Sequence, residues 1–137
     1  MKRAALPCAL ILGGLSALHA YWAGGGTAFA EAAVPTRPSR SEDEAEQPLF
    51  EPPRAATLTV ASALAVGALS VLITGFTGRG KRLTRLVALA FSLRAMGDFR
   101  YVGLTKRVKG TRFARRDSRI YTPLCLAVAS LARSASR

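Results

Sequence analysis

The chain has 137 residues, half of them hydrophobic, and combines a formal net charge of +12 with a positive mean hydropathy of +0.20. Such a combination argues against an ordinary soluble domain unless the apolar and the charged residues are segregated along the chain. They are segregated, because apolar stretches alternate with polar connections. The composition therefore predicts a single all-α membrane domain over residues 1–137.

The first apolar stretch covers residues 4–23, and His19 is its only strongly polar member. A helix of this length is about 30 Å long and matches the core of a bilayer. Ala28 to Ala30 downstream resembles a signal-peptide cleavage site, although the apolar core of a signal peptide usually runs only about 7–15 residues. The length favours a retained membrane helix, with cleavage of a signal peptide as the alternative.

A polar connection follows over residues 24–54. It begins with three glycines and contains five prolines and six of the eight acidic residues of the chain. It has little apolar surface to bury, so it is predicted to be a flexible loop. The next stretch, residues 55–76, has twenty-two residues without a charge and is predicted to be the second span.

Two shorter stretches complete the chain. Residues 83–99 and residues 120–135 are predicted as the third and fourth spans, although the former carries charged side chains. Laying residues 83–99 along the membrane surface gives a three-span alternative. Four spans place both termini on one side of the membrane. The Lys and Arg residues that flank the spans favour conflicting orientations, so the orientation stays open.

The third predicted span carries two opposite charges, Arg94 and Asp98. Side chains spaced i, i+4 lie on one face of a helix and can pair, which offsets much of the cost of a charge at membrane depth. One interpretation is an ion pair that fixes helix packing. The other is a polar pocket for a ligand, an ion or a proton, because ionisable residues inside a membrane are candidates for functional sites.

In the four-span model, the ends of the first and third spans and the start of the fourth span meet at one membrane face. The candidate polar cluster at this face consists of His19, Trp22, Arg94, Asp98, Arg100, Tyr101, Asp117 and Tyr121. Its aromatic members suit a membrane–water boundary. A lone histidine cannot form a multi-histidine metal site. No catalytic residue, cofactor or metal ion is predicted.

The connection over residues 100–119 carries eight Lys or Arg residues against one Asp. A basic segment held between two membrane spans is expected to contact anionic lipid head groups, at about 1 kcal/mol per cation near the surface. Nucleic acid is a weaker candidate partner, because a tether at the membrane already explains the same charges. The predicted partners are therefore membrane lipids, with a homo-oligomer left open.

Three stretches, LHAYWAGGG, LRAMGDFRYVG and TRFARRDSRIYTPLCL, occur in this order between the predicted spans. Together they resemble a bacterial family of small multi-pass membrane proteins described as domain of unknown function 3995. The resemblance implies a four-helix integral protein of the bacterial inner membrane. It implies no established biochemical activity.

Three functional hypotheses follow. The first is a non-enzymatic membrane protein with a structural, lipid-binding or interaction role, and it is preferred because no catalytic constellation is present. The second is a small transporter or proton- or ion-coupled permeation unit, which would need a homodimer because four short spans are few for a private pathway. The third is a membrane enzyme acting on a lipid or quinone, with His19, Asp98 and Asp117 as acid–base candidates.

Overall fold

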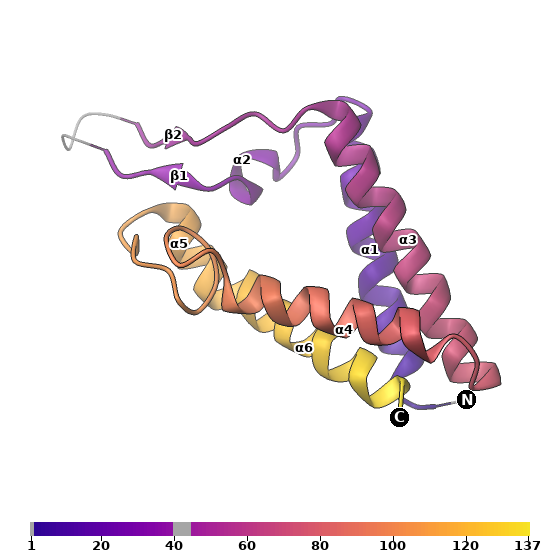
Figure 1. Ribbon diagram of the computed structural model, residues 1–137. Helices are drawn as coiled ribbons and strands as arrows, with labels where there is room; N and C mark the ends of the chain where they lie inside the picture. The colour runs from indigo at the N-terminus through magenta and orange to yellow at the C-terminus, as the bar shows by residue number, and fades with distance from the viewer. Residues whose placement is uncertain (1, 40–44) are drawn as a thin grey trace.

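The computed structural model describes residues 2–39 and 45–137, and most of these residues are helical (Figure 1). The long helices are α1 (Ala5–Ala23), α3 (Arg54–Thr77), α4 (Lys81–Met96) and α6 (Thr122–Ala135). The short elements are the helices α2 (Ala30–Ala33) and α5 (Arg112–Arg116), the strands β1 (Thr36–Arg37) and β2 (Gln47–Pro48), and the π-helical turn η1 (Asp117–Tyr121). The predicted helical fold class is confirmed.

The long helices form two antiparallel hairpins, α1 with α3 and α4 with α6, which diverge from a common vertex (Figure 1). Both termini and the turn between α3 and α4 lie at this vertex. The ammonium group of Lys81 donates to the backbone oxygen of Arg137 at 2.8 Å, and the N–H of Lys2 donates to the carbonyl of Gly75 at 3.1 Å. The vertex is therefore the closed end of the molecule.

The core lies where the two hairpins meet and is made mostly of small residues. Its buried members are Ala5, Cys8, Ala9, Leu12, Val71, Ala88, Val128, Ala132 and Ala135. Small side chains let helix backbones approach closely, which is how helices pack when the surrounding solvent is itself apolar. The two cysteines, Cys8 and Cys125, are free thiols buried among these helices.

Two glycines with positive φ, Gly78 and Gly80, make the turn from α3 to α4. The hydroxyl groups of Thr74 and Thr84 hydrogen-bond to each other at 2.8 Å across this turn, and Thr84 also donates to the carbonyl of Ser70 at 3.2 Å. Both threonines are fully buried, so their hydroxyl groups need these partners.

The segment between the two helices of the first hairpin, residues 24–53, is called the arm here. It leaves the open end of the α1–α3 hairpin and reaches α5 (Figure 1). Strands β1 and β2 pair in antiparallel register within it. The carboxylate of Glu46 accepts the N–H of Arg112 at 2.9 and 3.0 Å and the hydroxyl of Thr36 at 2.8 Å. The arm thus joins the open ends of the two hairpins. Three of the six acidic residues of this connection, at positions 42–44, lie outside the described residues.

Helix length separates the predicted spans into two groups. Helices α1 and α3, with 19 and 24 residues, are long and apolar enough to cross a membrane. Helices α4 and α6 have 16 and 14 residues, which at 1.5 Å per residue gives about 24 and 21 Å against a bilayer core of about 30 Å. The structure therefore supports the first two predicted spans by length and composition.

Candidate functional site

The candidate site is built around Asp117, whose side chain is completely buried at the junction of α5 and η1. One carboxylate oxygen accepts the guanidinium of Arg94 at 3.0 Å. The other accepts the ammonium of Lys106 at 2.9 Å, the N–H of Gly103 at 2.8 Å and the hydroxyl of Thr122 at 3.2 Å. These five residues, called the Asp117 cluster here, connect α4, the basic connection and α6.

Two glycines bring the chain back toward Asp117 after α4 ends. Gly97 has φ +95° and ψ −170°, a conformation that only glycine adopts without strain. Gly103 has φ +81°, and it lies so close to Ala95 and Gly97 that a Cβ there would collide with their backbone. The N–H of Leu104 then donates to the carbonyl of Ala95 at 2.8 Å. This fold-back places the N–H of Gly103 and the side chain of Lys106 against Asp117.

The charge state of Asp117 follows from these contacts. Burial raises the pKa of its carboxyl group, but hydrogen bonds from Lys106, the N–H of Gly103 and Arg94 outweigh it and hold the pKa below its ordinary value of 3.8. Asp117 is therefore ionised at neutral pH. A general acid or base works best with a pKa near the working pH. The lowered pKa of Asp117 therefore favours a structural role, in which it joins segments of the chain, over proton transfer.

The expected ion pair between Arg94 and Asp98 is wrong, because Arg94 pairs with Asp117. Helix α4 ends at Met96 rather than at residue 99, so Asp98 lies beyond the helix and the i, i+4 geometry does not exist. The carboxylate of Asp98 instead accepts the backbone N–H groups of Arg100, Tyr101 and Val102, at 2.9, 2.7 and 2.9 Å. Burial raises the pKa of Asp98, but these N–H groups more than offset it and lower the pKa.

The other predicted cluster members divide between the two hairpins. His19 and Trp22 bond locally, the ring of His19 to the carbonyl of Leu15 at 2.8 Å and the indole of Trp22 to the carbonyl of Ala28 at 2.7 Å. No hydrogen bond or ion pair within the described part of the chain joins them to the Asp117 cluster. The hairpins diverge, so the far end of α1 is separated from the far end of α4 (Figure 1).

Three predicted residues lie near the basic connection. The guanidinium of Arg100 lies 5.2 Å from the ring centroid of Tyr101. The hydroxyl of Tyr121 donates to the carbonyl of Ala32 in the arm at 2.8 Å. Lys106, which is only 6 % exposed, was not among the predicted cluster residues. It is one of eight cations in the basic connection, and nothing in its spacing distinguishes it from the others.

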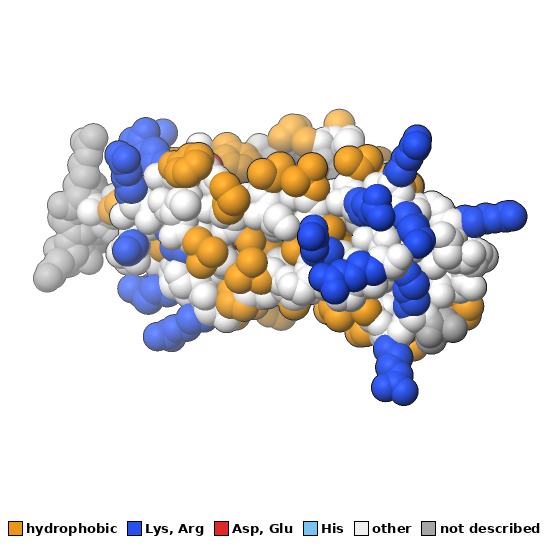
Figure 2. All heavy atoms as spheres, turned by 60° about the horizontal axis from the view of Figure 1, so that its bottom comes forward, with side chains coloured by type: hydrophobic (Ala, Val, Ile, Leu, Met, Phe, Trp, Pro, Cys, Tyr) orange, Lys and Arg blue, Asp and Glu red, His pale blue; other side chains and the backbone are white. Residues whose placement is uncertain are grey.

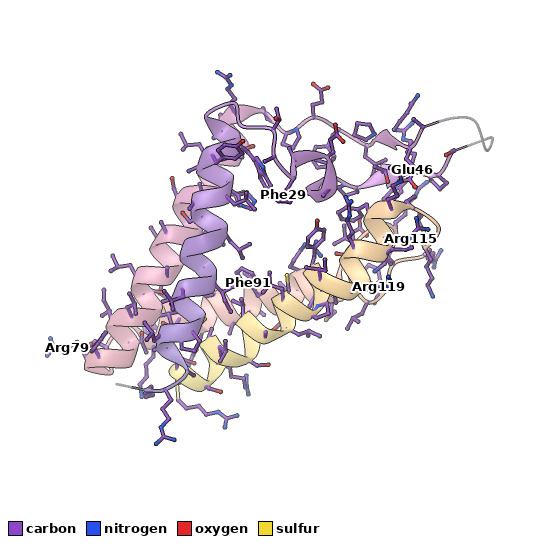
Figure 3. All side chains as sticks on the ribbon, turned by 180° about the vertical axis from the view of Figure 1, so that it is seen from behind. Phe29, Glu46, Arg79, Phe91, Arg115 and Arg119 are labelled. Atoms are coloured by element: carbon purple, nitrogen blue, oxygen red, sulfur yellow. The ribbon has the colours of Figure 1, made fainter. Side chains whose placement is uncertain are left out.

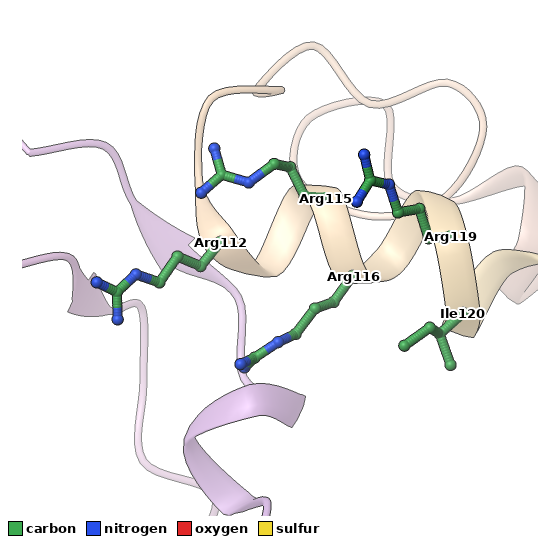
Figure 4. Close-up of a pocket in the computed structure, with 5 residues that line it drawn as sticks. All are labelled: Arg112, Arg115, Arg116, Arg119 and Ile120. Atoms are coloured by element: carbon green, nitrogen blue, oxygen red, sulfur yellow. The ribbon is translucent and has the colours of Figure 1, made fainter.

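Next to the Asp117 cluster, α5 and η1 carry a hollow of about 450 Å³. Four arginines and one isoleucine line this arginine pocket: Arg112, Arg115, Arg116, Arg119 and Ile120 (Figure 4). The pocket lies at the open end of the molecule, near Glu46 and far from Arg79 at the vertex (Figure 3). None of the four guanidinium groups has a carboxylate partner within residues 2–39 and 45–137, where the ion pairs join Asp117 to Arg94 and Lys106.

The chemistry of the arginine pocket is that of an anion site. A guanidinium group is always protonated and offers paired N–H donors that match phosphate or carboxylate oxygens. Within the described ranges, no group of three or more His, Cys, Asp or Glu side chains could hold a metal ion. Sequence reasoning identified the basic connection as a whole, but not the pocket that four of its arginines form.

A family model described as "Protein of unknown function (DUF3995)" matches residues 12–132. Comparison with curated proteins and comparison with solved structures both find no match.

Proposed function

The chain belongs to the DUF3995 family, and on this premise we propose that it is a multi-pass protein of the bacterial inner membrane that binds anionic lipid head groups without catalysing a reaction. The proposed contact surface is the basic connection, residues 100–119, together with the arginine pocket. The Asp117 cluster holds this surface in place. The proposal assigns the four long helices to the membrane and the arm to the same membrane face as the basic connection.

The observation that carries the proposal is the distribution of exposed apolar and basic side chains. Large apolar side chains are exposed along the long helices, among them Leu58, Val66, Leu69, Ile73 and Phe76 on α3 and Leu83, Leu86, Leu89, Leu93 and Met96 on α4. Figure 2 shows apolar side chains along the middle of one face and Lys and Arg side chains toward both ends. Soluble monomers rarely expose so much contiguous apolar surface, whereas a bilayer covers it and leaves the cations at its two surfaces.

The exposed face of α4 also favours four spans over three. A helix lying on the membrane surface needs one apolar face and one polar face. Outward-facing leucines run through α4 from Leu83 to Leu93, while Arg82 and Arg85 lie in its first turns near the vertex and Arg94 is paired in its last turn. Helices of this length can still cross if the bilayer thins locally or the long cationic side chains extend to the head groups.

A fractionation experiment tests the membrane assignment. The full-length chain should stay with the membrane after extraction with alkaline carbonate and should be released only by detergent. Purified and reconstituted protein should then enrich anionic phospholipid over phosphatidylcholine around itself, and salt should weaken this enrichment because the contacts are electrostatic. Release by carbonate, or a monodisperse chain in buffer without detergent, would refute the proposal.

The transporter hypothesis rests on a different observation. The Nη1 atom of Arg94 is buried and has no hydrogen-bond acceptor among the described residues. An anion passing between α4 and α6 would supply that acceptor, so this hypothesis expects anion flux into liposomes that hold the purified chain. If liposomes that contain the wild-type protein show no anion flux, the transporter hypothesis is refuted, and the lipid-binding proposal is unaffected.

A further inference from the structure

We infer that the arginine pocket binds the head group of a lipid whose phosphate is a monoester and carries two negative charges. This inference rests on the proposed function, because it names the site and the ligand class within the basic connection. Three features of the pocket lead to it: the pairing of its arginines, the rigidity of the backbone that carries them, and the apolar residue at its edge.

The four arginines are spaced as two i, i+4 pairs, Arg112 with Arg116 and Arg115 with Arg119. Figure 4 shows the guanidinium groups of Arg115 and Arg119 on one side of the helix and those of Arg112 and Arg116 directed toward the arm. Like charges at this spacing repel each other and destabilise a helix. A ligand with two negative charges converts that repulsion into attraction, and its terminal oxygens can accept N–H donors from two guanidinium forks.

The backbone beneath these arginines is held firmly from the other side. Phe113 is 3 % exposed and Asp117 is fully buried, so both anchor α5 and η1 to the rest of the chain. The hydroxyl of Thr111 caps α5 by accepting the N–H of Ala114 at 3.0 Å. Glu46 binds the N–H of Arg112, so this nearby acid is engaged with the backbone. The arginines therefore project from a fixed support, which lowers the entropy cost of binding a ligand.

The edge of the pocket indicates a lipid. Ile120 lines the hollow, is 54 % exposed and lies two residues before the start of α6. A molecule with a phosphate among the arginines would have its apolar part beside Ile120 and along the start of α6. Arginine at all four positions supplies planar forks that match phosphate oxygens, whereas lysine would supply the same charge without the fork.

The test compares two soluble short-chain lipids that differ in phosphate charge. Full-length protein is purified in a neutral detergent, and its thermal unfolding midpoint is titrated with dioctanoyl phosphatidic acid and with dioctanoyl phosphatidylglycerol. The work is done at about pH 8, above the second pKa of a phosphate monoester at about 6. We expect phosphatidic acid to bind about tenfold more tightly than phosphatidylglycerol.

Charge-conserving variants distinguish a site that recognises the geometry of the phosphate from general electrostatic attraction to anionic lipid. In Arg115→Lys/Arg119→Lys the preference for phosphatidic acid should vanish, while the net charge is unchanged. The matched control is Arg79→Lys/Arg82→Lys at the vertex, which should keep the preference. Arg112→Lys/Arg116→Lys provides a second pocket variant if the first one does not fold.

Three results would overturn the inference. Equal affinity of the wild-type protein for the two lipids would contradict the proposed site. A full preference for phosphatidic acid in both lysine variants of the pocket would contradict it as well. If inorganic phosphate bound as tightly as phosphatidic acid, the pocket would be a site for free anions and the lipid would be excluded as its specific ligand. In each of these cases a chain that resists carbonate extraction and enriches anionic lipid still supports the proposed function, so the two failures are distinguishable.

Discussion

At the scale of single residues, Asp117 holds together the segments that meet at the open end of the molecule. Its carboxylate is the common acceptor for two cations, one backbone N–H and one hydroxyl group. Removing a charged group from water is costly, and a buried ion pair roughly compensates that cost rather than adding much stability. The Asp117 cluster therefore contributes chiefly to specificity, because it defines a single path for the chain between α4 and α6.

Replacing that carboxylate should destabilise the fold, because it leaves a buried cation without its anionic partner. In Asp117→Asn, Lys106 stays buried at 6 % exposure without an anionic partner. We expect a loss of about 3 kcal/mol in the free energy of unfolding, measured by denaturant titration in detergent. The control is Asp98→Asn, which keeps an oxygen that can accept the N–H groups of the turn and should change stability little. Equal effects of the two substitutions would contradict the assigned role of Asp117.

The lowered pKa of Asp117 predicts a dependence of stability on pH. A carboxyl group whose pKa is lower in the folded state stabilises the fold above its unfolded value and loses that contribution as the pH falls through the folded value. Stability from Asp117 should therefore be complete near neutrality and should decline below about pH 4, near its ordinary value of 3.8. Unfolding midpoints measured from neutral to acidic pH should show this decline in the wild-type protein and a smaller one in Asp117→Asn.

At the scale of elements, the end of α4 is determined by backbone conformation. The positive φ and the ψ of −170° of Gly97 end the helix one residue before Asp98, which was predicted to lie on it. A Cβ at this position would collide with the carbonyl group of Val102. The fold-back that brings Gly103 and Lys106 to Asp117 therefore depends on glycine at position 97.

Substitution of that glycine should loosen the basic connection. Gly97→Ala should cost about 3 kcal/mol or more, because it combines a strained conformation with a steric clash. Trypsin should then cleave faster at Lys106 and Arg107, and the unfolding midpoint should fall. Gly110→Ala is the matched control, since a Cβ there meets nothing within 4 Å. If both variants resisted trypsin as the wild-type protein does, the fold-back would not depend on Gly97.

At the scale of the whole molecule, the two hairpins place the connections at opposite ends. The termini and the turn between α3 and α4 lie at the vertex, and the arm and the basic connection lie at the open end. On the face that Figure 2 shows, apolar side chains lie between the two basic ends. In the proposed four-span assignment, the two ends would lie on opposite sides of the membrane.

Cysteine accessibility tests this arrangement directly. Arg79 in the turn and Arg107 in the basic connection are both exposed, whereas Cys8 and Cys125 are buried. We expect an impermeant maleimide to label Arg79→Cys and Arg107→Cys from opposite sides of the membrane. If α4 instead lay along the surface, as in the three-span alternative, both positions would be labelled from the same side. The same labelling determines the orientation.

Local composition was sufficient for the coarse features of this protein. Uninterrupted apolar stretches predicted α1 and α3, because a run of about twenty apolar residues is typical of a helix that is long enough to cross a membrane. The motifs around Trp22, Asp98 and Asp117 identified the family, and the family model covers residues 12–132. The basic connection was also evident, since eight cations between two apolar stretches need no tertiary information to be recognised.

The tertiary structure alone decided which charges meet. Arg94 has an acid four residues away and another twenty-three residues away, and it pairs with the distant one. Spacing on a helix favoured Asp98, but the helix ends before that residue, and the positive φ angles of Gly97 and Gly103 carry the chain back to Asp117. Likewise, His19 and Trp22 are separated from this cluster because the hairpins diverge. Periodicity reports which face of a helix a residue occupies, whereas pairing depends on where the helix ends and how the connections close in space.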